Sequence, residues 1–360
     1  MAAFHPLTVA EVRRETRDSV VLTLDVPDGL KDAFRFTQGQ YLTFRARIDG
    51  EEIRRSYSIC AAAHEPAPKV AVKKVEGGLF STWANEALKP GQTIEAMPPM
   101  GGFFVPLDPA ARRHHVGFAA GSGITPLLSI IKTTLTAEPR SSFTLFYGNR
   151  ASGSIMFRED LEDLKSLYMG RFSLVHILSR EQQDIDLFNG RLDRAKCDQL
   201  LERWVDPSSI DVAFICGPQQ MMLDVSASLK EHGVEPGRIK FELFATADAG
   251  RRARPEATVE KSAAARADLC RATVVLDGLA RSFELEKGAV TILDAATREG
   301  LDLPYACKAG VCSTCRAMLV EGRVDMDANY ALEDYEVARG YVLTCQSYPI
   351  TDRIVVDFDR

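Results

Sequence analysis

The stretch PYACKAGVCSTC, residues 304–315, decides how the last quarter of the chain folds. It places three cysteines within nine positions in the spacing C-x4-C-x2-C, and a fourth follows after 29 intervening residues. Half of the eight cysteines thus form one set, which predicts a metal centre held by thiolates. The set comprises Cys307, Cys312, Cys315 and Cys345, whereas three of the scattered cysteines are expected only to pack: Cys60, Cys197 and Cys270.

The spacing favours one metal centre over another. A structural zinc site usually has paired C-x2-C knuckles, but this chain has a single knuckle preceded by C-x4-C. The pattern resembles that of the plant-type ferredoxin family, in which four thiolates hold a 2Fe-2S cluster. The small residues Ala306, Ala309 and Gly310 would let the backbone approach the cluster and donate N–H groups to its sulfides. A zinc site remains the alternative.

The residues around this loop predict an α+β plant-type ferredoxin (β-grasp) domain over residues 269–360. The Asp277-Gly278 pair is a strong hairpin signal, and Gly300 is a typical helix stop. The elements expected are a hairpin of residues 274–276 and 282–285, a helix at 291–299, and strands at 317–320 and 354–358.

Residues 246–268 are rich in Ala, Arg and Glu and nearly free of large apolar side chains, which predicts a flexible linker. Beyond it, residues 269–360 carry 10 Lys and Arg against 15 Asp and Glu, a net charge of −5 out of −6 for the chain. Two interpretations stay open. The acidity serves the docking of an electron-carrying module, or it confers only solubility.

The first part of the chain, residues 1–105, predicts an antiparallel β-barrel. Short alternating segments are separated by Gly, Pro and Asp, and long amphipathic helices are lacking. Strands are expected at residues 20–24, 41–45, 54–59, 70–75 and 93–96.

Two motifs in this part suggest an anion-binding cofactor site. Arg55-Ser56-Tyr57-Ser58 lies in one strand, where period-two alternation puts Arg55 and Tyr57 on one face and Ser58 on the other. Residues 70–85, VAVKKVEGGLFSTWAN, read as a strand that turns through two glycines into a helix. The free N–H groups and the dipole of that helix, at residues 78–82, suit a pyrophosphate.

Residues 106–245 predict an α/β domain with a parallel, doubly wound sheet. A strand at 115–120 enters Gly121-Ser122-Gly123-Ile124-Thr125-Pro126, and a helix follows at 127–135. This G-x-G-x-x-P turn is not the G-x-G-x-x-G dinucleotide fingerprint, and no acidic residue stands about 20 positions on. Strands and helices continue to alternate at residues 143–147, 157–166, 172–178, 212–216 and 219–232.

Together the motifs R-x-Y-S, G-x-x-S, G-x-G-x-T-P, C-G-P and E-x-F resemble the ferredoxin-NADP reductase superfamily. The resemblance implies a barrel that binds FAD and a sheet that binds a nicotinamide dinucleotide. FMN is the minority alternative, because the phthalate-type reductases share this domain order but use FMN.

The resemblance also assigns roles to residues of this chain. Those expected at the site of hydride transfer are Ser58, Cys216 and Glu242. Flavin contacts are expected from Arg55, Tyr57, Ser58, Val72, Lys73, Gly77, Gly78, Ser81 and Phe244. The dinucleotide is expected to lie on Gly121, Gly123, Thr125, Pro126, Arg150, Ser179, Arg180, Cys216, Gly217 and Pro218.

Charge favours NADPH as the dinucleotide. Arg150 follows one predicted strand, and Ser179 and Arg180 follow the next. Arginine gives planar, bidentate donors to a 2′-phosphate, whereas NAD sites tend to place a carboxylate on the ribose hydroxyl. Glu181, directly after Arg180, counts against this preference.

The order of flavin barrel, nicotinamide domain, linker and ferredoxin domain resembles the reductase components of multicomponent oxygenases. The partner that this implies is an oxygenase component, of the di-iron type, which accepts electrons from the cluster. Two alternatives are a reductase for another acceptor, such as another hydroxylase or a hybrid-cluster protein, and a redox-sensing module.

The composition argues against two other classes of protein, nucleic-acid-binding proteins and membrane-spanning proteins. A net charge of −6 and a pI of about 5.7 argue against a nucleic-acid surface, and no apolar run approaches the roughly 20 residues that span a bilayer. No basic segment followed by an apolar one opens the chain, so a cytoplasmic location is expected.

Overall fold

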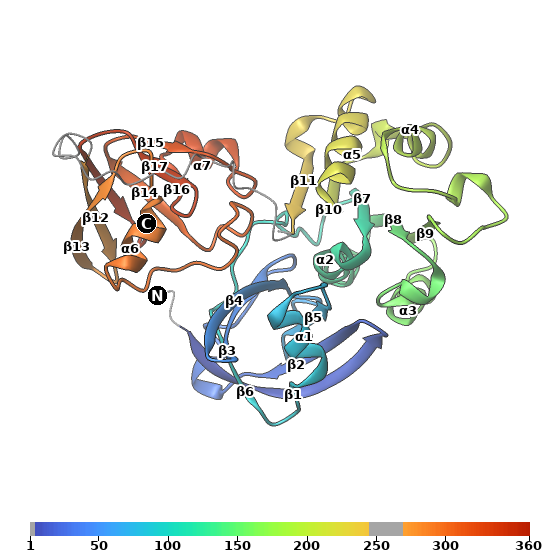
Figure 1. Ribbon diagram of the computed structural model, residues 1–360. Coiled ribbons are helices and arrows are strands. Elements are labelled where there is room, and N and C mark those ends of the chain that lie inside the picture. Colours follow the sequence, from blue (N-terminus) through green and yellow to red (C-terminus); the bar gives the residue numbers. More distant parts are fainter. Residues whose placement is uncertain (1–3, 245–268) are drawn as a thin grey trace. The chain divides into compact units, whose positions relative to one another are not determined.

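The computed structural model describes residues 4–244 and 269–360, which fall into two compact units (Figure 1). The first unit runs from Phe4 to Phe244, and the second is described from residue 269 onward. The predicted linker at residues 246–268 lies outside the described residues.

The first half of the larger unit is an antiparallel barrel. Its six strands follow the order β4-β3-β6-β1-β2-β5, and a bridge between Ile59 and Val70 joins the two ends. Alternate side chains fill the interior, with Leu22, Phe44 and Val72 fully buried. The elements are β1 (His5–Thr16), β2 (Ser19–Asp25), β3 (Tyr41–Ile48), β4 (Glu51–Ser58), β5 (Lys69–Lys73), α1 (Leu79–Glu86) and β6 (Thr93–Ala96).

The second half of this unit is a five-stranded parallel sheet in the order β11-β10-β7-β8-β9. The chain moves outward from β7 to β9 and then crosses back to β10 and β11. Helices α2 and α3 therefore lie on one face of the sheet, and α4 and α5 lie on the other (Figure 1). The elements are β7 (His114–Ala120), α2 (Ile124–Ala137), β8 (Ser142–Asn149), α3 (Arg158–Leu167), β9 (Phe172–Leu178), α4 (Arg194–Arg203), β10 (Val212–Gly217), α5 (Gln219–Glu231) and β11 (Ile239–Leu243).

This strand order puts a topological switch point between β7 and β10. The chain leaves the carboxyl ends of these two neighbours in opposite directions, toward α2 and toward α5. In open α/β sheets, ligands bind in the crevice that forms there. Both glycine-containing turns singled out in the sequence lie at this point.

The second unit has a five-stranded mixed sheet in the order β13-β12-β18-β14-β16, with a separate pair of β15 and β17. Asp277 and Gly278 both have positive φ, 53° and 73°, as a two-residue hairpin turn requires. The elements are β12 (Leu269–Leu276), β13 (Leu279–Glu286), α6 (Ile292–Arg298), β14 (Arg316–Glu321), β15 (Val324–Met326), α7 (Asp334–Ala338), β16 (Tyr341–Leu343), β17 (Ser347–Pro349) and β18 (Arg353–Asp357).

The predicted fold class, a barrel followed by a parallel sheet and an α+β ferredoxin domain, is thus confirmed. Among residues 4–244 and 269–360, no helix is both long enough and apolar enough to cross a membrane.

A buried polar cluster closes the amino-terminal edge of the parallel sheet. The fully buried carboxylate of Glu138 accepts hydrogen bonds from the Ser141 hydroxyl at 2.7 Å and from the Asp108 N–H at 3.1 Å. It also lies 3.3 Å from His115 Nε2 and from Arg113 Nη1. Burial alone would raise the pKa of Glu138, but these hydrogen bonds outweigh it and lower that pKa.

We expect Glu138→Gln to lower the free energy of unfolding by about 2–4 kcal/mol at pH 7, because a charge-assisted buried network is broken. Since the folded pKa lies below the ordinary value of about 4.3, wild type holds this advantage fully above that pH. The advantage shrinks as the pH falls through the folded pKa. Urea unfolding at pH 7 and at pH 4 measures both effects.

Glu231→Gln is the matched control. Glu231 pairs with Arg194 on the surface, and such exposed pairs contribute roughly 0–1 kcal/mol. Equal losses in the two variants would contradict a structural role for the buried cluster.

Candidate functional site

The turn after β7 fits tightly against the end of β10. Gly121 has a φ of +55°, and a Cβ on Gly123 would lie 2.1 Å from the Cys216 carbonyl oxygen. Only glycine therefore fits at position 123. The Thr125 hydroxyl donates to the Ser122 carbonyl oxygen at 3.0 Å, and Pro126 lies in the first turn of α2, where a missing N–H costs nothing. The hydroxyl of Thr125 and the close contact with Cys216 together hold this turn in place.

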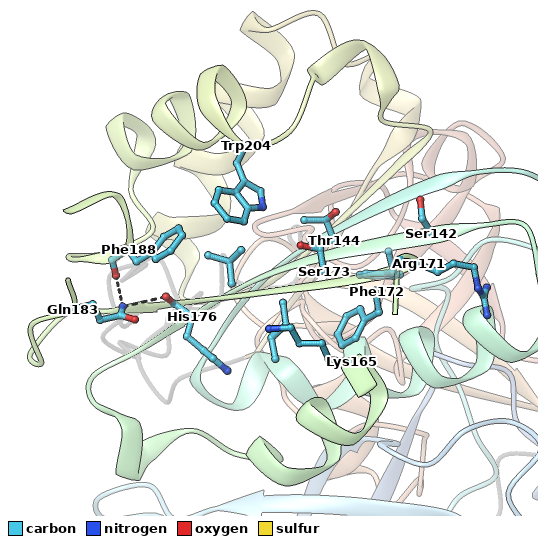
Figure 2. A pocket seen from close by; sticks show the side chains of 14 residues that line it. Ser142, Thr144, Lys165, Arg171, Phe172, Ser173, His176, Gln183, Phe188 and Trp204 are labelled. Carbon is cyan, nitrogen blue, oxygen red and sulfur yellow. Dashed lines mark hydrogen bonds between the residues drawn. The ribbon is translucent and has the colours of Figure 1, made fainter. Parts of the chain in front are cut away.

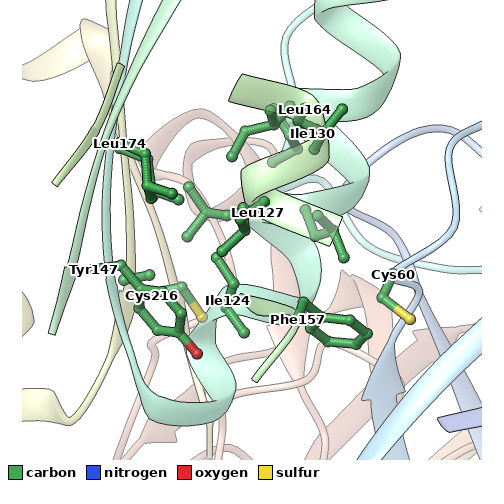
Figure 3. Packing of buried hydrophobic residues seen from close by; sticks show 14 of the residues in the cluster. Cys60, Ile124, Leu127, Ile130, Tyr147, Phe157, Leu164, Leu174 and Cys216 are labelled. Atoms are coloured by element: carbon green, nitrogen blue, oxygen red, sulfur yellow. The ribbon is translucent and has the colours of Figure 1, made fainter. Parts of the chain in front are cut away.

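The turn Cys216-Gly217-Pro218, at the end of β10, lies on the other side of the switch point from the turn after β7. Cys216 is fully buried beside Ile124 and Tyr147 (Figure 3). Burial raises the pKa of its thiol well above the ordinary value, and the charge of Glu242 adds to the shift. Cys216 is therefore a neutral thiol that packs in the core beneath the two turns. A Cβ on Gly217 would lie 2.7 Å from Met221 Cε, so a side chain there would force Met221 to move.

Glu242 links the sheet to the barrel. It is the register partner of Cys216, and its Oε2 accepts a hydrogen bond from the Ser58 hydroxyl at 3.0 Å. Burial raises the pKa of Glu242 to about 7, although the bond from Ser58 opposes the shift. The three residues predicted for hydride transfer thus come together, and one of them can gain or lose a proton near neutral pH.

The predicted flavin residues of β4 lie on the barrel beside Ser58. The Tyr57 ring packs against Phe80 and Phe44, with centroid distances of 5.4 and 6.3 Å. Arg55 is exposed, and its Nη1 donates to the Arg54 carbonyl oxygen at 2.7 Å. An aromatic face and a guanidinium therefore stand on the strand that also carries Ser58.

Helix α1 begins where the sequence predicted a pyrophosphate site. Gly77 has a φ of +70°, and Gly78 caps the helix without a side-chain bond, so the first N–H groups of α1 lack an intrahelical partner. The Ser81 hydroxyl accepts from the Val75 N–H and donates to the Gly78 carbonyl oxygen, both at 3.1 Å. Ser81 therefore braces this turn.

Three further predicted flavin residues differ in accessibility. The Val72 side chain is fully buried in the barrel core, so it cannot face a ligand in this structure. Lys73 is half-buried, 3.9 Å from Asp18. Phe244 is partly buried against the cluster that contains Cys216.

Arg150 and Arg180 are exposed at the ends of β8 and β9. The Arg180 N–H donates to the Arg150 carbonyl oxygen at 2.8 Å, and the Ser179 N–H donates to the Asn149 carbonyl oxygen at 3.0 Å. Glu181 accepts from the Ser152 N–H at 2.7 Å and from its hydroxyl at 2.5 Å, and these bonds lower the pKa of Glu181. The carboxylate that counted against NADPH is therefore bound to Ser152.

Sequence reasoning missed two residues that hold these turns. The Tyr147 hydroxyl donates to the Gly121 carbonyl oxygen at 2.9 Å. Asn85 donates to the carbonyl oxygens of Val72 at 3.0 Å and Ser81 at 2.8 Å. A signal existed for Asn85, because it lies one helical turn after Ser81 on the same face.

The four predicted cluster cysteines come together as two pairs. Hydrogen bonds join Cys307 to Cys312 and Cys315 to Cys345, and Cys312 is close enough to Cys315 to act on its charge. The bond from Cys312, followed by N–H groups of residues 309, 311 and 312, lowers the pKa of Cys307 to about 6 despite its burial. Positive φ at Lys308 (53°) and Gly310 (74°) folds this loop back on itself.

This arrangement fits a two-iron cluster better than a single zinc ion. Two adjacent thiol pairs would supply two ligands to each of two irons, as a 2Fe-2S cluster requires, whereas one zinc ion would take all four thiolates itself.

A separate cavity of about 640 Å³ lies beside the edge strand β9 (Figure 2). Its walls include Lys165, His176, Phe188 and Trp204, and none of the predicted site residues lines it.

Three families match the chain in the expected order. They are an oxidoreductase FAD-binding domain over residues 6–105, an oxidoreductase NAD-binding domain over 118–227 and a 2Fe-2S iron-sulfur cluster binding domain over 274–349. A chain with these three domains is an NAD(P)H-dependent flavoprotein reductase with an iron-sulfur centre. The matches confirm the predicted cofactor classes, FAD, a nicotinamide dinucleotide and a 2Fe-2S cluster, and favour FAD over FMN.

Two curated relatives show which group of flavoprotein reductases the chain belongs to. The chain is 47% identical over 359 residues to a subunit of 1,2-phenylacetyl-CoA epoxidase from Escherichia coli (strain K12), covering 100% of this chain and 99% of the relative. It is 34% identical to the 3-ketosteroid-9-alpha-monooxygenase ferredoxin reductase component of Rhodococcus rhodochrous, covering 98% and 96%. The chain therefore belongs to the ferredoxin-NADP reductase family, among the oxygenase reductases that carry a 2Fe-2S domain.

A solved structure agrees in fold. Phthalate dioxygenase reductase superposes with a TM-score of 0.59 at 22% identity and covers 99% of this chain and 98% of its own. At that identity the likeness supports the fold alone.

We expect the rate of flavin reduction by NADPH to rise as the pH increases through about 7, because ionised Glu242 would stabilise the positive charge that develops on a bound nicotinamide. Glu242→Gln keeps the side-chain shape but cannot titrate, so its rate should stay flat from pH 6 to 8. Ser58→Ala should move the midpoint of the pH profile above 7, since the Ser58 bond lowers that pKa. Anaerobic stopped-flow absorbance measures all three proteins, and an unchanged pH profile in Glu242→Gln would refute the assignment.

Proposed function

We propose that this reductase passes electrons from NADPH to the di-iron oxygenase component of a phenylacetyl-CoA epoxidase. The observation that carries the proposal is the 47% identity to a subunit of such an enzyme, which extends over nearly the full length of both chains. The 34% identity to a ketosteroid monooxygenase reductase makes that oxygenase the main rival acceptor.

The chemistry explains why both cofactors are needed. A nicotinamide delivers two electrons as one hydride and a 2Fe-2S cluster accepts one electron at a time, so a flavin, which handles either, stands between them. The chain supplies the geometry for this sequence. Glu242 and Ser58 hold a proton at the meeting point of barrel and sheet, and Cys216 closes that point to water by its burial.

The residues proposed to hold each cofactor follow from their placement. Tyr57 and Arg55, on β4, would hold the flavin, and the start of α1 at Gly78 would receive its pyrophosphate. The backbone of the turn from Gly121 to Thr125 and the C-G-P turn would hold the dinucleotide. The cluster ligands are Cys307, Cys312, Cys315 and Cys345.

We infer four segments along the chain. They are an FAD-binding barrel at residues 1–105, an NADP-binding domain at 106–245, a flexible linker at 246–268 and the ferredoxin domain at 269–360. The three family matches fall within the first, second and fourth of these.

A cytoplasmic location is also part of the proposal. All eight cysteines lie in the described residues and none of them forms a disulfide, although Cys315 and Cys345 are adjacent. Thiols stay reduced in such positions in the cytoplasm, whereas an oxidising compartment favours disulfides.

The acceptor is tested by reconstitution. Purified reductase, a di-iron phenylacetyl-CoA epoxidase component, NADPH and phenylacetyl-CoA should give epoxide in proportion to NADPH oxidised. Cys312→Ser should abolish epoxide formation and the cluster's visible absorption, while NADPH still reduces the flavin at a rate close to that of wild type. Loss of flavin reduction in this variant would contradict separate modules. Coupled turnover only with a ketosteroid oxygenase would refute the proposed acceptor.

Substitutions at the ends of β8 and β9 test whether the protein prefers NADPH to NADH. Arg150→Ala combined with Arg180→Ala should raise KM for NADPH at least tenfold more than KM for NADH, because two guanidiniums that would bind the 2′-phosphate are lost. Lys165→Ala, on α3 beside the separate cavity, is the matched charge control and should leave both constants unchanged. Equal increases for NADPH and NADH in the double variant would overturn the assignment.

A further inference from the structure

Gln346 is a buried amide directly after the fourth cluster cysteine. Only 4% of the residue is exposed. Its Nε2 lies 2.9 Å from the Lys308 carbonyl oxygen, 3.0 Å from the Cys345 carbonyl oxygen and 3.7 Å from Cys345 Sγ. The amide therefore reaches both the loop that carries Cys307 and the sulfur of Cys345.

The position of this side chain is fixed from several directions. A Cβ on Gly310 would lie 3.1 Å from Gln346 Cγ, so the glutamine stem packs against a glycine that leaves room for it. The Gln346 N–H donates to the Leu343 carbonyl oxygen at 2.9 Å, and its carbonyl oxygen accepts from the Asp327 N–H at 3.0 Å. Backbone and stem together aim the amide into the cysteine loop.

Packing alone does not require an amide here. Leucine has a similar volume, and a buried polar group is costly unless its hydrogen bonds are made. What the amide adds is two N–H donors, which bind the carbonyl oxygens of Lys308 and Cys345 and share a longer contact of 3.7 Å with the ligand sulfur Cys345 Sγ. Such donors stabilise negative charge on the sulfur, and that charge is greater when the cluster is reduced.

We propose that Gln346 is a positioning residue that raises the reduction potential of the 2Fe-2S cluster by donating a hydrogen bond to Cys345 Sγ and by tying the Cys345 segment to the Cys307 loop. This rests on the proposed ligand role of Cys345.

The first test is the midpoint potential of the cluster in the full chain, followed by EPR. In Gln346→Leu we expect the ratio of reduced to oxidised cluster at a fixed potential to fall about tenfold, which is a shift of about −59 mV for a one-electron couple. A cluster that stays intact with an unchanged potential would overturn the inference.

Thr344→Val is the matched control, because Thr344 flanks Cys345 on the other side and is fully buried. Its hydroxyl donates to the Cys315 carbonyl oxygen at 3.0 Å, which is a backbone acceptor. This variant should lose stability yet keep the wild-type potential. A shift as large as that of Gln346→Leu would attribute the effect to loosened packing and refute the hydrogen bond.

A second test needs no substitution. Gln346 is the only glutamine in residues 269–360, so glutamine labelled with ¹⁵N at the side-chain amide places one labelled amide in this domain. Pulsed EPR of the reduced wild-type protein should detect ¹⁵N coupling to the cluster, and its absence would overturn the inference even if Gln346→Leu fails to fold. A wild-type cluster that survives Cys345→Ser would instead refute the proposed ligand set.

Discussion

The structure of residues 4–244 depends on the contact between Gly123 and the carbonyl of Cys216. The two turns at the switch point approach so closely that a methyl group at position 123 would lie 2.1 Å from that oxygen. Strands β7 and β10 pair in parallel and present their carboxyl ends together, and β11 pairs with β10 so that Glu242 lies beside Cys216. Glu242 then reaches Ser58 on the barrel, so these strand ends bring together the groups proposed to meet both cofactors.

Much of this could be predicted from the sequence, because certain residues leave few alternatives. The Asp277-Gly278 turn and the C-x4-C-x2-C loop each allow few conformations, and the structure has the expected hairpin and paired cysteines. Strand β1 was missed because charged residues such as Arg13 and Arg14 obscure its alternation. Helix α4 was missed because only three of its side chains are buried, which leaves a weak apolar period.

The sequence could not predict which side chains pair with one another. Glu181 follows Arg180 directly, yet its carboxylate binds Ser152, 29 positions away. The hydroxyl of Ser81, expected at a phosphate, also braces its own turn, while the Val72 side chain is buried in the barrel core. Such choices depend on which groups tertiary folding brings within hydrogen-bond distance, and local patterns carry no information about that.

The central claim is that one chain holds a two-electron carrier and a one-electron carrier in series. Anaerobic titration with NADPH, followed by absorbance and EPR, tests it most directly. Complete reduction should take about three electrons per chain, or about 1.5 equivalents of NADPH, and should produce the EPR signal of a reduced 2Fe-2S cluster. Complete bleaching at one equivalent without that signal would contradict the account.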